Sequence, residues 1–156
     1  MHTRLNPHAV APKAMEPMLA LEAYIHGSGL AHSLIELVKT RASQINGCAY
    51  CLHMHTHDAR EAGESEARLY LLSAWRESRL YTDKERAALA WTEALTRIAE
   101  TAAPDADYEP LKAHFSEEEI VALTLLITTI NAWNRIAIGF RSQHPRDRAP
   151  RTAEAA

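Results

Sequence analysis

The chain has 156 residues, enough for a single domain that buries a hydrophobic core. Its hydrophobic content of 47%, charged content of 24% and net charge of −3 suit a globular protein and argue against a basic surface for nucleic acid. The first fifteen residues lack the apolar run of a signal peptide, and the segment from Ile120 to Trp133 is too short and too polar to cross a bilayer. We therefore expect a cytoplasmic protein without nucleic-acid or membrane partners.

Helical patterns dominate the chain, and no strand pattern stands out. Residues 1–12, which include Pro7 and Pro12, are expected to form an extended arm. Apolar residues at helical spacing predict helices over 13–26 and 31–45, which end at the glycines of 27–29 and at Asn46-Gly47. A third helix is predicted to open at the cysteine pair and to run to residue 62, with Gly63 as its C-cap.

Polar residues mark the starts of the later helices. The three expected starts, two of them capping boxes, are Ser65, Thr82 with Glu85, and Ser116 with Glu119. The helices predicted from them cover 65–75, 82–98 and 116–140, and residues 142–156 are predicted to be disordered. The chain is thus expected to be an all-α bundle over 13–141. Because its last helix is apolar nearly all round, that helix is predicted to lie centrally or at a homo-oligomer interface.

Two cysteines, Cys48 and Cys51, are the only ones in the chain, and His55 follows four residues after the second. On one helix the three side chains fall along a single stripe. Backbone N–H groups at a helix N-terminus stabilise a thiolate, and a histidine one turn away can take its proton. Since the cytoplasm keeps thiols reduced, the pair would cycle and would not be a permanent cross-link. The pattern therefore predicts thiol–disulfide chemistry.

A carboxylate that could orient the histidine lies on the preceding helix. Glu36 is flanked on both sides by apolar residues, at 34–35 and 37–38. A buried carboxylate needs a partner, and His55 across the Asn46-Gly47 turn would supply one. The alternative is an ordinary surface glutamate.

Other interpretations of these residues are structural or metal-binding. The cysteines could be two small buried hydrophobic residues, or zinc ligands together with His55 and either His53 or His57. A zinc site lacks a second Cys/His pair at the usual distance, and His53 and His57 taken alone are typical of a solvated surface. The tryptophans Trp75, Trp91 and Trp133 are expected in the core or an interface, and Asn131 and Asn134 are expected to cap or bridge neighbouring helices.

Glu36, eleven intervening residues, and then Cys48-x-x-Cys51-x-x-x-His55 form a specific pattern. It resembles the alkylhydroperoxidase AhpD-like group of the carboxymuconolactone decarboxylase superfamily, and residues 41–48, 59–63 and 85–91 are similar too. The resemblance covers residues 13–140. It implies an all-α fold that assembles through dimers, often into a trimer of dimers, and that reduces hydroperoxides. It also implies that Cys51 is the attacking thiolate, Cys48 the resolving thiol, and Glu36 with His55 the proton relay.

One position departs from the family pattern. The better-studied peroxidase members carry a histidine just before the second cysteine, where this chain has Tyr50, a poor base near neutral pH. We expect a thiol-dependent alkyl hydroperoxide reductase that uses a hydroperoxide substrate and a cellular dithiol or redox partner protein, with no cofactor and no metal. The alternatives are a disulfide reductase for a partner protein and a non-enzymatic redox or zinc-binding module. The decarboxylase branch of the superfamily needs no Cys-x-x-Cys, so the intact pair argues against it.

Overall fold

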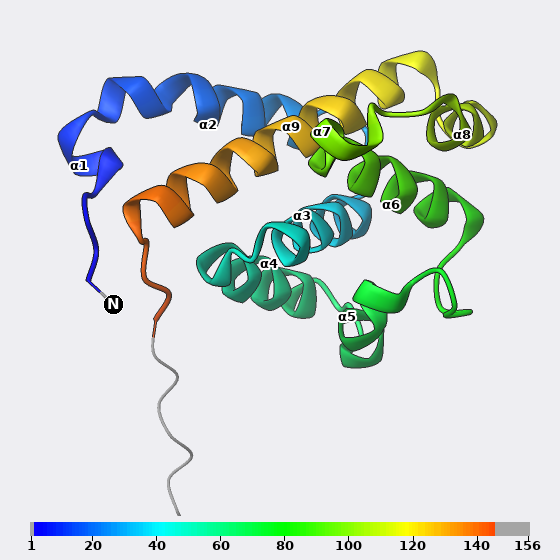
Figure 1. The fold of residues 1–156 in the computed structure, drawn as a ribbon, viewed down its shortest axis with the longest axis horizontal. Helices are drawn as coiled ribbons and strands as arrows, with labels where there is room; N and C mark the ends of the chain where they lie inside the picture. The colour runs from blue at the N-terminus through cyan, green and yellow to red at the C-terminus, as the bar shows by residue number, and fades with distance from the viewer. Residues whose placement is uncertain (1, 146–156) are drawn as a thin grey trace, which may run out of the picture.

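A computed structural model describes residues 2–145 as a bundle of helices, with no strand in that part of the chain (Figure 1). The elements in chain order are α1 (Pro7–Val10), α2 (Pro12–His26), α3 (His32–Asn46), α4 (Ala49–Glu61), α5 (Glu66–Leu71), the 3-10 helix η1 (Leu72–Ala74), α6 (Asp83–Thr96), α7 (Ile98–Thr101), α8 (Asp105–Tyr108), the 3-10 helix η2 (Glu109–Ala113) and α9 (Glu117–Phe140). The predicted all-α fold is confirmed.

The helix ends follow the local sequence signals closely. Both predicted capping boxes are present, with Thr82 and Ser116 each accepting from the backbone N–H three residues on. Gly47 ends α3 in the left-handed region at φ 70°, a conformation that costs glycine little. The helix predicted over 82–98 stops at Thr96, and α7 continues it after a break. The short helices α8 and η2 were not predicted.

Helix α3 lies at the centre of the bundle and packs against α4, α6 and α9, while α2 and α9 run side by side (Figure 1). The main core combines apolar residues of these helices with fully buried side chains such as Ile35, Val38, Leu123 and Ile127. Burial of this kind stabilises the fold by about 25 cal/mol per Å² of apolar surface. The core therefore holds α3 rigidly, and α3 carries Glu36.

Helix α9 corrects the expectation that this segment is too short and too polar to span a membrane. Its 24 residues, with a mean hydropathy of 1.4 over the best window, are long and apolar enough to do so by length and composition alone. Half of that window is buried inside the protein, which is typical of the core helix of a globular domain. Val121 and Ile138 remain about half exposed on its outer side.

The two ends of the described chain meet at one end of α9 (Figure 1). The backbone N–H of Arg4 donates to the carbonyl of Phe140 over 2.9 Å, and its guanidinium donates to Gly139. The predicted extended arm contains one helical turn, α1, which Asn6 caps, and α2 already begins at Pro12. Of the tail predicted to be disordered, residues 142–145 continue from α9 and 146–156 lie outside the described residues.

Asparagines connect α3 to α9, as the sequence predicted. The Asn46 side-chain amide donates to the side-chain oxygens of Asn131 and Asn134 over 2.9 and 2.8 Å. Asn134 is fully buried and donates in turn to Ser43. Because buried amides need partners, this network fixes the register of the two helices just before the cysteine pair.

Candidate functional site

The cysteine pair stands at the start of α4. Cys48 is the N-cap, reached directly from the left-handed Gly47, and Cys51 is the third residue of the helix. The two sulfurs form a disulfide, with the Cα atoms 5.4 Å apart. Both residues are buried, at 1% and 2% exposure. The backbone N–H of Cys51 donates to the sulfur of Cys48 over 3.3 Å, so the helix N-terminus acts on Cys48.

Glu36 and His55 form the predicted pair. A Glu36 carboxylate oxygen lies 2.9 Å from His55 Nδ1, and the two residues are only 3% and 5% exposed. The alternative of a surface glutamate is therefore wrong. Adjacent helices joined at Gly47 bring together residues nineteen positions apart. The pairing leaves the other ring nitrogen, Nε2, free for chemistry.

Electrostatics keeps Glu36 ionised. Burial raises the pKa of this carboxyl, but the hydrogen bond and charge of His55, with smaller contributions from Lys39 and His32, lower it below its usual value. An ionised carboxylate can only accept a hydrogen bond. Nδ1 of His55 therefore donates to Glu36, and in the neutral form of the ring Nε2 carries the lone pair that can act as a base.

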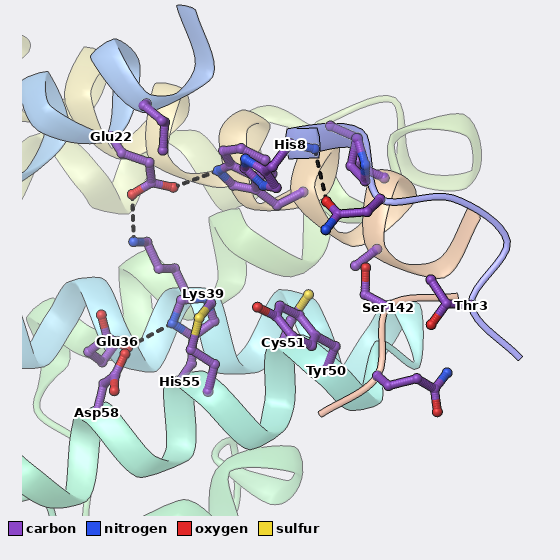
Figure 2. Close-up of a pocket in the computed structure, with 18 of the residues that line it drawn as sticks. Thr3, His8, Glu22, Glu36, Lys39, Tyr50, Cys51, His55, Asp58 and Ser142 are labelled. Carbon is purple, nitrogen blue, oxygen red and sulfur yellow. Dashed lines mark hydrogen bonds and ion pairs between the residues drawn. The ribbon is translucent and has the colours of Figure 1, made fainter. Parts of the chain in front are cut away.

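A cavity of about 720 Å³ opens beside these residues (Figure 2). Cys51, Tyr50 and His55 line it from α4, and Glu36 lines it from α3. Cys48 is not among the lining residues, so a small molecule in the cavity meets Cys51. The remaining walls come from α1, α2, α9, the N-terminal arm and the segment after α9.

A second charged pair in this cavity was missed by the sequence reasoning. Lys39, one turn after Glu36 on α3, is 4% exposed and donates to Glu22 of α2 over 2.7 Å (Figure 2). The other oxygen of Glu22 accepts from the indole N–H of Trp133 over 3.0 Å. Trp133 was expected in the core or an interface, yet it lines the cavity. The sequence feature that could have indicated this pair is Lys39 itself, a lysine at the end of the apolar run that contains Glu36 and therefore a candidate for a buried charge that needs a partner.

The candidate zinc ligands are not brought together. His53 stacks on His144, with ring centroids 5.0 Å apart, and His57 is exposed beside Asp58. A metal-compatible group does exist, because ligand atoms of Glu36, His55 and Asp58 lie within 4.8 Å of one another. It contains neither cysteine, and its Glu36–His55 contact is already satisfied as a hydrogen bond. The arrangement is therefore better suited to moving protons than to zinc binding through thiolates.

Together these residues provide a thiol–disulfide pair, a general base oriented by a carboxylate, and space for a small molecule at one sulfur. A nucleophile, a base and an orienting group in this relation are the usual parts of an activated thiol. The geometry thus supports redox chemistry at Cys51.

Comparison with known proteins agrees with this geometry. Residues 12–94 match the carboxymuconolactone decarboxylase family. The chain is 44% identical to protein YdfG of Bacillus subtilis over 138 residues, which cover 88% of this chain and 94% of YdfG.

Solved structures show the same fold. The crystal structure of ATU0492 from Agrobacterium tumefaciens, a protein of unknown function with a suggested role as the antioxidant defence protein AhpD, has a TM-score of 0.90 and 54% identity. That match covers 94% of this chain and all of the other. The debrominase Bmp8 has a TM-score of 0.75 at 22% identity, over 86% of this chain and 72% of its own, which shows a shared fold alone. The chain belongs to the carboxymuconolactone decarboxylase family, within its AhpD-like group.

Proposed function

We propose that the protein is a thiol-dependent reductase of organic hydroperoxides, with Cys51 as the nucleophile. The observation that supports it most is that Cys51 and the Glu36–His55 pair line one cavity while Cys48 lies behind Cys51 at bonding distance. A substrate that enters the cavity meets the attacking sulfur and the base together. The resolving sulfur is already in place.

The reaction begins with the reduced pair. Nε2 of His55 takes the proton of the Cys51 thiol, and the carboxylate of Glu36 stabilises the resulting imidazolium. The thiolate attacks the distal oxygen of R–O–O–H, the O–O bond breaks, and Cys51 becomes a sulfenic acid. The alkoxide that leaves takes a proton from His55 and departs as an alcohol.

Resolution follows from the neighbouring cysteine. The Cys48 thiolate attacks the Cys51 sulfur, a disulfide forms, and the departing hydroxide takes a proton to become water. Two electrons have then passed from the two thiols to the peroxide. A cellular dithiol returns them by thiol–disulfide exchange, and its own sulfurs become a disulfide.

The alternative function, reduction of a disulfide in a partner protein, fits the site less well. A disulfide inside a folded partner would have to reach sulfurs that are 1% and 2% exposed, whereas a small dithiol that restores the pair can reach Cys51 through the cavity. A hydroperoxide needs only the cavity. A non-enzymatic zinc module is less well supported, since within residues 2–145 the metal-compatible group contains neither cysteine.

The proposal also includes a cytoplasmic homo-oligomer, a dimer or a trimer of dimers. Leu19 and Tyr24 of α2 are each 53% exposed, and Val121 and Ile138 of α9 are exposed as well. Exposed apolar residues on two adjacent helices favour a subunit interface. Sedimentation equilibrium of the purified protein tests it, and a monomer at micromolar concentration would contradict it.

The direct test of the activity is a thiol count on fully reduced protein under argon, before and after one equivalent of cumene hydroperoxide. We expect both thiols to be lost and one equivalent of cumyl alcohol to form. Cys51→Ser should keep its remaining thiol and leave the hydroperoxide intact. Cys48→Ser should stop at a sulfenic acid, which dimedone labels on Cys51.

Survival of both thiols in the wild type would exclude the proposed reaction. Peroxide consumption by Cys51→Ser at the wild-type rate would place the nucleophile elsewhere. Dimedone labelling of Cys48 in Cys51→Ser would reverse the roles of the two cysteines.

A further inference from the structure

The cavity contains a buried positive charge that the proposed reaction does not yet use. Lys39 is 4% exposed, and its ammonium lies among the residues that line the cavity with Cys51. Removal of an ammonium from water is unfavourable unless it is paired. Lys39 is paired with Glu22, but the position lies one helical turn from Glu36 and beside the proposed relay (Figure 2).

The ion pair is held in place by three helices. Glu22 of α2 receives Lys39 of α3 on one oxygen and the indole of Trp133 of α9 on the other. Trp133 in turn stacks on His8 of α1, with ring centroids 6.1 Å apart. These contacts hold the ammonium in a fixed position relative to Glu36. Its positive charge therefore acts on the ionisable groups of the cavity from a fixed place.

The other ionisable groups that face the cavity define the charge balance. They are His8 from α1, Glu22 and His26 from α2, His32 and Glu36 from α3, and Tyr50, His55 and Asp58 from α4. Three of them are carboxylates, and Lys39 is the one lysine among the lining residues of the described chain. Forming a Cys51 thiolate adds another negative charge, which the field of the ammonium offsets.

We propose that Lys39 is a positioning residue of this site: its ammonium, fixed by Glu22, keeps Glu36 a carboxylate and favours the thiolate of Cys51 over the thiol. The inference rests on the proposed function, in which that thiolate attacks the substrate. Burial raises the pKa of Glu36, and Lys39 acts with His55 to lower it, which agrees with this role. The negative charge of Glu22, which is ion-paired with Lys39, reduces the influence of the ammonium on Glu36 and Cys51.

The test is a pH titration of thiolate absorbance at 240 nm. Using Cys48→Ser as the background leaves Cys51 as the only thiol and keeps a side-chain acceptor at the N-cap. Adding Lys39→Met should raise the midpoint of thiolate formation by about 1 pH unit. Iodoacetamide alkylation at pH 7 should slow by up to about tenfold, while Lys39→Arg should restore both values.

Glu22 separates an electrostatic role from a purely structural one. If the field matters, Glu22→Gln lowers the midpoint, and Lys39→Met combined with Glu22→Gln returns it close to the background value. If the pair is only a structural link, the two single variants shift the midpoint in the same direction or leave it unchanged, and the proposal is overturned. Should Lys39→Met fail to fold by circular dichroism, the sign of the Glu22→Gln shift decides the question.

Lys84→Met is the matched control. Lys84 is ion-paired with Glu119 outside the cavity, so the same chemical change there should leave the midpoint at the background value. No peroxide enters these titrations. They therefore test Lys39 even if the thiol count with cumene hydroperoxide were negative, and the two failures are distinguishable.

Discussion

Replacing Glu36 by Gln tests the central electrostatic element of the site. Glutamine has the shape of glutamate, and its carbonyl oxygen can still accept the Nδ1 proton of His55, now over a neutral hydrogen bond. What the variant loses is the negative charge that stabilises the imidazolium. The proposed mechanism forms that imidazolium each time Cys51 gives up its proton.

The size of the effect follows from the burial of the pair. Glu36 and His55 are only 3% and 5% exposed. In the wild type they form a charge-assisted hydrogen bond worth about 1.5–3 kcal/mol, and Glu36→Gln replaces it with a neutral one worth about 0.5–1.5 kcal/mol. We expect the free energy of unfolding to fall by about 1 kcal/mol at pH 7. General acid–base catalysis contributes about 10²–10⁴ in rate. Since His55 remains as a weaker base, kcat/KM for cumene hydroperoxide should fall about 100-fold.

The pH dependence of this stability difference has a defined sign. The folded protein holds the pKa of Glu36 below its ordinary value, despite the burial that raises it, because His55 and Lys39 favour the carboxylate. The stabilisation is therefore complete above the unfolded-state pKa, about 4.3, and is lost as the pH falls through the lower folded-state value. The difference between wild type and Glu36→Gln should be full at pH 7 and should shrink below about pH 4.

The first assay is urea unfolding of the two oxidised proteins at pH 7 and pH 3.5. The second is stopped-flow peroxide reduction at pH 7 by the two proteins in reduced form, with a dithiol in excess to restore the cysteine pair. Glu109→Gln is the control, because that glutamate pairs with Lys112 at the surface. A Glu36→Gln protein with wild-type kcat/KM would refute the role of the carboxylate. So would a stability difference that grows as the pH falls.

Substitutions at three further positions test other parts of the structure. Asn134→Ala should cost about 2 kcal/mol in urea unfolding, because Asn134 is fully buried and its loss removes both an acceptor of Asn46 and the donor to buried Ser43; an unchanged midpoint would contradict this. Glu93→Ala should cost about 3–5 kcal/mol by leaving buried Arg41 without its carboxylate, and Glu93→Gln should cost less; equal thermal shifts would argue against a charge effect. Tyr50→Phe should keep peroxide reduction and its pH profile, and a large loss of kcat/KM would instead give the phenol a catalytic role.

The sequence predicted the elements best where a local chemical rule determines the backbone. Thr82 and Ser116 start helices because their side chains satisfy free backbone N–H groups, and Gly47 ends one because glycine adopts positive φ at little cost. The Glu36–His55 contact was predictable for a related reason. A carboxylate in an apolar run needs a buried partner, and the short Asn46-Gly47 turn limits the choice to α4.

The features that were missed depend on contacts between distant segments. The Lys39–Glu22–Trp133 network joins residues up to 111 positions apart, so no short-range spacing of residues in the sequence predicts it. Likewise, the arm before α1 contacts the end of α9 through Arg4, whose guanidinium donates to Gly139, 135 positions along the chain. The walls of the cavity, unlike its reactive centre, are therefore a property of tertiary packing.

The two cysteines differ in environment because they occupy different positions at the start of α4: Cys48 is the N-cap and Cys51 is the third residue. Cys48, as N-cap, accepts a backbone hydrogen bond and lies away from the cavity. Cys51 faces the cavity, and His55 follows it by one turn, with a side chain that leans toward the helix N-terminus. In the proposed reaction, the substrate therefore meets the sulfur nearer the base. The sulfur stabilised by the helix end is left as a thiolate that attacks the sulfenic acid. In the proposed mechanism, this single turn of α4 distinguishes the attacking sulfur from the resolving one, which the spacing of the two cysteines alone does not.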